Sequence, residues 1–239
     1  MRKSGKHEEA IKSYQQAIRI DPDDAKAHYN LGLAYHKLGK YQEAIESYKQ
    51  AIRIDPDHAL AHDNLGAAYE KSGKNEEAIE SYKQAIRIDP DYAEAHNNLG
   101  IAYGESGKYE EAIESFKQAI RIDPDNANTH YNLGLTYRKL GRYEEAIESY
   151  KQAIWIDPDF AKAHFSLGLA YYESGMYKEA IESFRQAIRI DPDDAGAHFN
   201  LGDAYLGLND EDSALEQHEI LKSLDSELAN KLFNLIYSE

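Results

Sequence analysis

The apolar residues of this chain fall into short stripes with helical spacing, separated by polar turns. Between residues 25 and 38, alanine, leucine and tyrosine side chains recur every three or four positions, as on the buried face of an amphipathic helix. A second stripe lies between residues 41 and 54. Gly39 separates the two and suits the left-handed conformation that ends a helix. Asp55-Pro56 ends the second helix, because the residue before a proline avoids the helical region. The pattern predicts an antiparallel hairpin of two helices, which we name A and B.

This hairpin pattern recurs with a period of 34 residues. All six prolines follow an aspartate, at Pro22, Pro56, Pro90, Pro124, Pro158 and Pro192, and twelve of the 15 glycines fall on two phases of the same period. Asp57, one residue after the second proline, is placed to cap the next helix A. Gly32 lies in the middle of helix A, where glycine costs about 1 kcal/mol relative to alanine. We therefore expect helix B of the same hairpin to approach Gly32 closely.

The period reads Ala-x-Ala-His-x-Asn-Leu-Gly-x-Ala-Tyr, then Gly-x-Tyr-x-Glu-Ala-Ile-Glu-Ser-Tyr-x-Gln-Ala-Ile-x-Ile-Asp-Pro. This pattern resembles the tetratricopeptide repeat (TPR) family over nearly the whole chain, with His28 at the family's first aromatic position. The resemblance implies an all-α, right-handed superhelical solenoid of antiparallel helix-turn-helix hairpins, with a concave groove lined mainly by A helices. The predicted repeats are 25–58, 59–92, 93–126, 127–160, 161–194 and a degenerate sixth at 195–228, with a helix-B half repeat at 1–24 and a capping helix at 229–239.

Composition and charge narrow the functions that such a fold serves. The formal net charge of −16 disfavours a nucleic-acid binder, and the absence of cysteine excludes disulfides and thiolate chemistry. No apolar run is long enough for membrane insertion and no signal peptide is visible, so a cytoplasmic location is the default expectation. No nucleophile, metal or dinucleotide motif occurs. We therefore expect a non-enzymatic protein without a cofactor or metal, whose partner is a protein or peptide.

Six of the ten histidines share one phase of the period, at His28, His62, His96, His130, His164 and His198. Equivalent helices of neighbouring hairpins lie at least ~8–10 Å apart, which is too far for these side chains to share one metal ion. We interpret them as packing residues. If they are buried and neutral, the fold should be acid-sensitive, because charging a buried imidazole requires its desolvation.

Helix B is nearly constant between repeats, whereas helix A varies at its second, fifth, ninth, twelfth and thirteenth places, which in the TPR family point toward the groove. In repeats four to six these places gather aromatic and apolar side chains beside one arginine, as binding hot spots do. The predicted site comprises Tyr131, Leu135, Arg138, Phe165, Leu169, Tyr172, Phe199 and also Leu206. The alternative is that some of these rings pack between hairpins. The favoured function is a non-catalytic adaptor that binds an extended peptide or partner segment.

An asparagine recurs at the sixth place of helix A, at Asn30, Asn64, Asn98, Asn132 and Asn200, with Ser166 in the fifth repeat. Each amide can donate to and accept from an extended peptide backbone. This ladder is similar to the asparagine ladder in the TPR arm of O-linked N-acetylglucosamine transferases. The resemblance therefore adds a further alternative, the substrate-recruiting arm of a larger enzyme. The structural alternative is that the amides cap helices or hydrogen-bond between hairpins.

The two ends of the chain are the irregular parts. Residues 1–24 contain a helix B without its helix A, so the stripe with Ile11, Tyr14 and Ile18 is expected to be uncovered. Residues 229–239 are predicted to form a lone helix A that includes Leu232 and Phe233, with Ile236 where the other repeats have glycine. One interpretation is simple capping. The alternative is a head-to-tail homo-oligomer in which the last helix of one copy completes the first half repeat of another. Residues 195–239 carry a net charge of −7, which would steer a basic partner toward that end.

Overall fold

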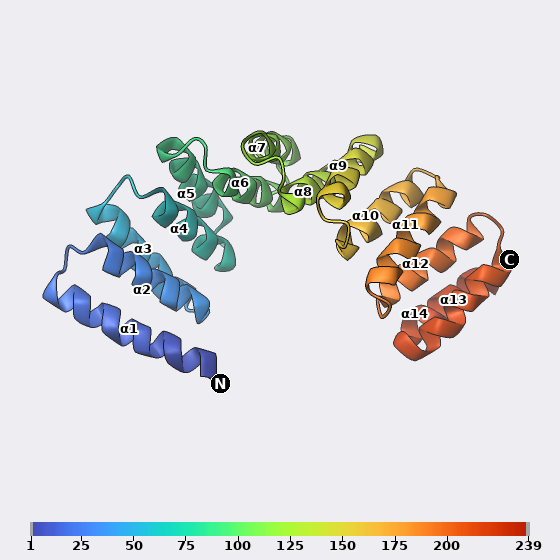
Figure 1. Cartoon of the computed structure of the whole chain (residues 1–239), viewed down its shortest axis with the longest axis horizontal. Coiled ribbons are helices and arrows are strands. Elements are labelled where there is room, and N and C mark those ends of the chain that lie inside the picture. Colours follow the sequence, from blue (N-terminus) through green and yellow to red (C-terminus); the bar gives the residue numbers. More distant parts are fainter. Residues whose placement is uncertain (1, 238–239) are drawn as a thin grey trace. The chain divides into compact units, whose positions relative to one another are not determined.

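The computed structural model describes the backbone of residues 2–237 and the side chains of residues 6–237, and helices joined by short turns make up this part of the chain (Figure 1). The A helices are α2 (Ala25–Lys37), α4 (Ala59–Lys71), α6 (Ala93–Glu105), α8 (Ala127–Lys139), α10 (Ala161–Glu173) and α12 (Ala195–Leu206). The B helices are α1 (Arg2–Ile20), α3 (Tyr41–Ile54), α5 (Asn75–Ile88), α7 (Tyr109–Ile122), α9 (Tyr143–Ile156), α11 (Tyr177–Ile190) and α13 (Glu211–Leu224), and α14 (Ser226–Tyr237) follows. The predicted all-α class of antiparallel hairpins is confirmed.

The chain divides into two compact units, Met1–Pro124 with α1–α7 and Asp125–Glu239 with α8–α14. Within each unit, an A helix packs on the B helix of its own hairpin and on the B helix before it. Neighbouring A helices also contact one another, as α2, α4 and α6 do in the first unit. The A helices of a unit therefore form one continuous layer, and the side chains they present away from the B helices share one surface, which we call the A-helix face.

The mid-helix glycines are required by close packing between the helices of a hairpin. A Cβ atom added to Gly32 would lie 2.6 Å from the ring of Tyr48, and one added to Gly100 would lie 2.6 Å from the ring of Phe116. The expected close approach of helix B is confirmed. The glycines at the A–B turns serve a different purpose, since Gly39 has a φ of 73°, which only glycine adopts at little cost.

The caps of the A helices lie one residue later than the sequence pattern predicts. Asp24 caps α2, because its side chain accepts the backbone N–H of Ala27, whereas His58 occupies the equivalent place before α4 and makes no such bond. Asp57 instead donates its backbone N–H to the side chain of Asp55 (3.3 Å), which shapes the turn at the proline. The prediction that Asp57 caps α4 is therefore wrong.

The last helix begins earlier, and in a different register, than a helix A of the repeat would. Asp225 accepts the backbone N–H of Leu228 at 3.0 Å, so α14 starts at Ser226 and not at residue 229. Its buried residues are Ala229 and Leu232, whereas Leu235, which the repeat pattern places inward, is 42% exposed. The predicted register of this helix is therefore wrong.

Leu232 takes over a role that aromatic residues have in the other hairpins. The B helix α13 carries His218 where α3 carries Tyr48, and the ring of His218 donates through Nδ1 to the carbonyl of Ala229 (3.0 Å). Gly202 is therefore covered by Leu232 in place of an aromatic ring, and a Cβ atom added to Gly202 would lie 2.5 Å from Leu232 Cδ2. α14 thus closes the apolar end of the unit.

Candidate functional site

The aromatic and apolar side chains predicted for the groove lie on the A-helix face of the second unit, and all are half-buried. Phe165 leans against Phe184 with ring centroids 5.8 Å apart, and Tyr131 lies 5.0 Å from Phe160. Leu169 and Leu206 pack on the same core as Phe165, while Phe199 packs on the cluster beneath α14. We call Tyr131, Leu135, Arg138, Phe165, Leu169, Tyr172, Phe199 and Leu206 the aromatic face. Each ring therefore has one side against its own core, and part of its surface stays exposed.

Two polar contacts join neighbouring hairpins across the aromatic face. Arg138 Nη1 donates to Glu173 Oε1 at 2.8 Å, with 21% of the arginine side chain exposed. Tyr172 Oη donates to Asp203 Oδ2 at 2.8 Å. Burial, followed by this hydrogen bond, raises the pKa of Tyr172, so the hydroxyl stays protonated. These contacts hold the arginine and the tyrosine in place beside the apolar side chains.

One tyrosine of helix B, Tyr82, reaches across its hairpin to the twelfth place of helix A, a feature that the sequence analysis missed. Tyr82 Oη donates to Glu70 Oε2 at 3.3 Å. Gly104 and Tyr172 occupy the twelfth place in other repeats, and there helix B carries phenylalanine, Phe116 and Phe184. The signal in the sequence is this pairing of tyrosine with a polar twelfth residue, which is visible only when the two helices are read together.

The amides of the asparagine ladder already make hydrogen bonds within the chain. Asn64 Nδ2 donates to the carbonyl of Leu60 (2.8 Å) and to Tyr29 Oη (3.3 Å). Asn98 Nδ2 donates to Asp63 Oδ1 (3.1 Å) on the preceding A helix. The alternative of hydrogen bonds between hairpins therefore describes these two amides, whereas Asn200 bonds its own helix at the carbonyl of Gly196 (2.8 Å). The contacts of these three amides all use Nδ2 as the donor. Asn30 and Asn132 lie at the corresponding places of α2 and α8.

Asp63 is a buried carboxylate that the sequence analysis did not single out. Its residue is 5% exposed, and besides Asn98 it accepts a hydrogen bond from Tyr92 Oη at 3.3 Å. Burial, chiefly, and the charge of Glu94 raise its pKa to about 6. The sequence does carry a signal for Asp63. It is the one acidic residue at the fifth place of helix A, which is tyrosine, asparagine or phenylalanine in the other repeats.

The histidine ladder braces the turns that precede the A helices. The Nε2 atom of His28 lies 3.0 Å from the carbonyl of Pro22, and His62, His96, His164 and His198 repeat this contact at 3.0–3.1 Å. His198 alone among these five is buried, and its Nδ1 lies 2.8 Å from Gln217 Oε1. The condition of burial, on which the expected acid sensitivity depends, is therefore fully met only by His198 among these five, and the other four are half-buried. In the described residues no group of histidine and acidic side chains is arranged to hold a metal ion.

Two of the residues predicted for self-association are covered within the chain. Ile11 packs on Leu31 and Ala34 of α2, and Leu232 is fully buried. Tyr14 and Ile18 are half-buried against the same cluster as Ile11. Ile236 is half-buried and packs inward beside Leu206. Phe233 stays 44% exposed, and its ring contacts that of His218 at a tilt of 45° with centroids 5.4 Å apart.

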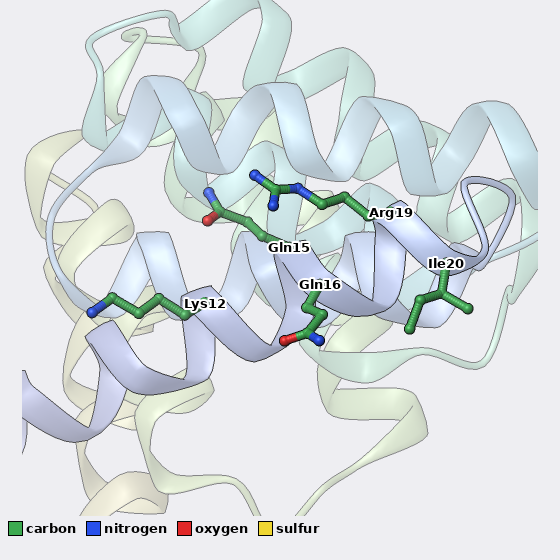
Figure 2. Close-up of a pocket in the computed structure, with 5 residues that line it drawn as sticks. All are labelled: Lys12, Gln15, Gln16, Arg19 and Ile20. Carbon is green, nitrogen blue, oxygen red and sulfur yellow. The ribbon is translucent and has the colours of Figure 1, made fainter.

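A polar pocket of about 560 Å³ lies along α1. Figure 2 shows its lining, Lys12, Gln15, Gln16, Arg19 and Ile20, which all extend from this one helix. Gln15 is held by a hydrogen bond to Tyr35 Oη (3.1 Å). None of the described helices is long and apolar enough to cross a lipid bilayer.

Comparison with known proteins assigns the fold family. The family model described as the Cilia and flagella-associated protein 70 C-terminal domain matches residues 24–230, and a TPR repeat model matches residues 1–39. The crystal structure of MamA is 33% identical, covers 69% of this chain and 96% of its own, and superposes with a TM-score of 0.65. No curated protein matches the chain in sequence.

Two further solved structures share the fold at lower identity. YrrB, a TPR protein with an unusual peptide-binding site, is 21% identical over 78% of this chain and 96% of its own, with a TM-score of 0.66. PilF of Pseudomonas aeruginosa is 22% identical over 96% of this chain and 98% of its own, with a TM-score of 0.73. The repeating hairpins, the glycine contacts and these matches together show that the chain belongs to the tetratricopeptide repeat family.

Proposed function

We propose that this protein is a non-catalytic scaffold that holds an extended segment of a partner protein on its A-helix face. The observation that carries the proposal is the aromatic face, where half-buried rings and one tethered arginine share a surface. Such side chains lose little conformational freedom on binding and supply most of the energy at binding hot spots. Membership of a family of protein-interaction scaffolds supports this function, and the peptide-binding site of YrrB is a precedent within the fold.

The test uses peptides selected from a random library on the full chain, with dissociation constants measured by calorimetry. Replacing Phe165 or Tyr172 by alanine should weaken the selected peptides by roughly 1–3 kcal/mol each. Tyr172→Phe separates the loss of the ring from the loss of the bond to Asp203. The matched control is Trp155→Ala, because Trp155 is 75% exposed on the B helix α9. An equal loss in the control, or none in either variant, would remove the aromatic face as the binding site.

A second candidate function is head-to-tail self-association. On α1, Ala10, Tyr14 and Ala17 are half-buried, whereas their equivalents on α3 are fully buried by the helix A of their own hairpin. At the other end Phe233 and Tyr237 are exposed. Light scattering over a hundredfold range of concentration tests this candidate. A constant mass near 27.1 kDa excludes it, and a rising mass that Tyr14→Lys abolishes supports it.

A further inference from the structure

The A-helix face of the first unit carries a buried carboxylate that no cation compensates. Asp63 is 5% exposed, and both of its hydrogen-bond donors, Tyr92 Oη at 3.3 Å and Asn98 Nδ2 at 3.1 Å, are neutral. Among the described residues no lysine, arginine or histidine forms an ion pair with it. An ionised carboxylate offers about four acceptor positions, so Asp63 retains capacity for further donors.

The charges around Asp63 are themselves acidic. Glu70 on the same helix and Glu94 on α6 both raise the pKa of Asp63, after burial, which is the largest cause. The cationic or titratable basic groups in contact with Glu70 are Lys71, whose Nζ is 2.9 Å from Glu70 Oε1 and whose side chain is 56% exposed, and His36, whose pKa is lowered chiefly by burial. The ionisable groups in electrostatic contact with Asp63 are Glu70, Glu94, Tyr29, Tyr48, Tyr82 and Tyr92. None of these six supplies a positive charge.

A second observation beside the carboxylate is a buried hydroxyl with no partner. Tyr48 is fully buried, and its Oη has no hydrogen-bond partner among the described residues. Its ring lies 5.9 Å from that of Tyr29, and the field of Asp63 contributes to its raised pKa. A buried polar atom left unpaired is destabilising until a ligand or a water bonds it.

The A-helix face of the first unit also carries small residues where other repeats have larger ones. The ninth place of α4 is Ala67, where α2 and α6 carry Leu33 and Ile101. The twelfth place of α6 is Gly104, and a Cβ added there would meet nothing within 4 Å. Acceptors and negative charge therefore lie on an A-helix face that carries small residues at Ala67 and Gly104.

We propose that Asp63, with Glu70, Glu94 and the hydroxyl of Tyr48, forms a subsite for an arginine or lysine side chain of the bound segment. The inference rests on the proposed function, because this side chain belongs to a peptide held on an A-helix face, here that of the first unit. A guanidinium or ammonium group brings several N–H donors and the missing positive charge. Binding should tighten as the pH rises through about 6, since the carboxylate must lose its proton to pair with the cation.

The experiment is fluorescence anisotropy with the full chain at pH 7.5 and physiological salt. One probe is a capped, fluorescein-labelled nonapeptide with arginine at its centre between phenylalanine and serine residues, and the second has glutamine in that place. The variant Asp63→Asn should weaken the arginine probe about tenfold or more and leave the glutamine probe unchanged. The matched control is Asp212→Asn, an exposed residue of α13 that undergoes the same change of charge.

The outcomes separate the subsite from the groove. If the two probes bind the native chain equally, the groove remains and the cationic subsite is wrong. If Asp212→Asn weakens the arginine probe as much as Asp63→Asn does, the attraction is that of the overall charge of −16 and the subsite is again wrong. If neither probe binds, the groove and the subsite fail together. A variant that misfolds is recognised by loss of its helical circular dichroism. In that case Asp63→Glu, which keeps the charge, replaces it, and this variant should still bind the arginine probe more tightly than the glutamine probe.

Discussion

The carboxylate of Asp63 links the stability of the chain to pH. Its pKa in the fold, about 6, exceeds the ordinary value of 3.8, so the folded state holds this proton more tightly than the unfolded state. The stabilisation from this proton is complete below pH 3.8 and is lost as the pH rises through 6. A shift of this size corresponds to a free energy on the order of 3 kcal/mol.

Replacing Asp63 by asparagine should therefore stabilise the free protein at neutral pH. We expect Asp63→Asn to raise the free energy of unfolding by ~1–3 kcal/mol at pH 7.5, because no charge is then buried. Near pH 4 the difference should nearly vanish. Urea unfolding followed by circular dichroism at both pH values measures this. A lower stability of the variant at pH 7.5 would mean that Asp63 is a structural residue whose charge the fold requires.

Histidine residues also make the stability depend on pH in this range, but in the opposite direction to Asp63. Burial, chiefly, lowers the pKa of His62, so its protonation favours the unfolded state and stability falls below about pH 6.5. His36 has a lowered pKa for the same reason. Acid sensitivity is therefore expected from these two side chains, and thermal melts of His62→Gln at pH 7 and pH 5 should show a smaller loss on acidification than the native chain shows.

Within the histidine ladder, burial decides how much each residue contributes. We expect His198→Ala to lower the free energy of unfolding by ~2–3 kcal/mol, because it leaves the buried amide of Gln217 without its partner. His28→Ala removes one hydrogen bond at a partly exposed turn and should cost about 0.5–1 kcal/mol. Urea titrations of both variants provide the comparison, and equal losses would contradict this assignment.

At the scale of a single helix, α6 offers a matched pair of glycines. A methyl group at Gly100 would collide with the ring of Phe116, so Gly100→Ala should destabilise the fold by ~1–3 kcal/mol through overpacking. Gly104 has open space around its Cα, and Gly104→Ala should stabilise by up to about 1 kcal/mol through helix propensity. Thermal melts distinguish the two, and changes of the same sign in both variants would show that propensity, not packing, governs both places.

At the scale of the whole molecule, the stability of a repeat array depends on its neighbouring contacts and its caps. Leu232 is fully buried over Gly202, whereas the adjacent Phe233 is exposed. We expect Leu232→Ala to lower the free energy of unfolding by ~2–5 kcal/mol and Phe233→Ala by less than about 1 kcal/mol. Chemical denaturation of the two variants measures the difference. A similar loss in both would indicate that α14 covers the end of the unit through Phe233 as well.

The sequence by itself determined the repeating hairpins, the helix ends at Gly39 and Asp55-Pro56, and the close approach at Gly32. These features depend on local periodicity, backbone preference and the absence of a side chain, all of which are written in consecutive residues. The aromatic face was likewise visible as variation between repeats, although its half-buried state was not.

Only the tertiary structure decided which side chains meet across hairpins. Asp63 and Asn98 are 35 residues apart, and their contact requires the packing angle that brings α4 beside α6. The register of α14 likewise followed from Asp225 capping the helix early and from Leu232 filling the surface over Gly202. Contacts of this kind arise from the distance between helices and the volume left between them, which no single repeat encodes.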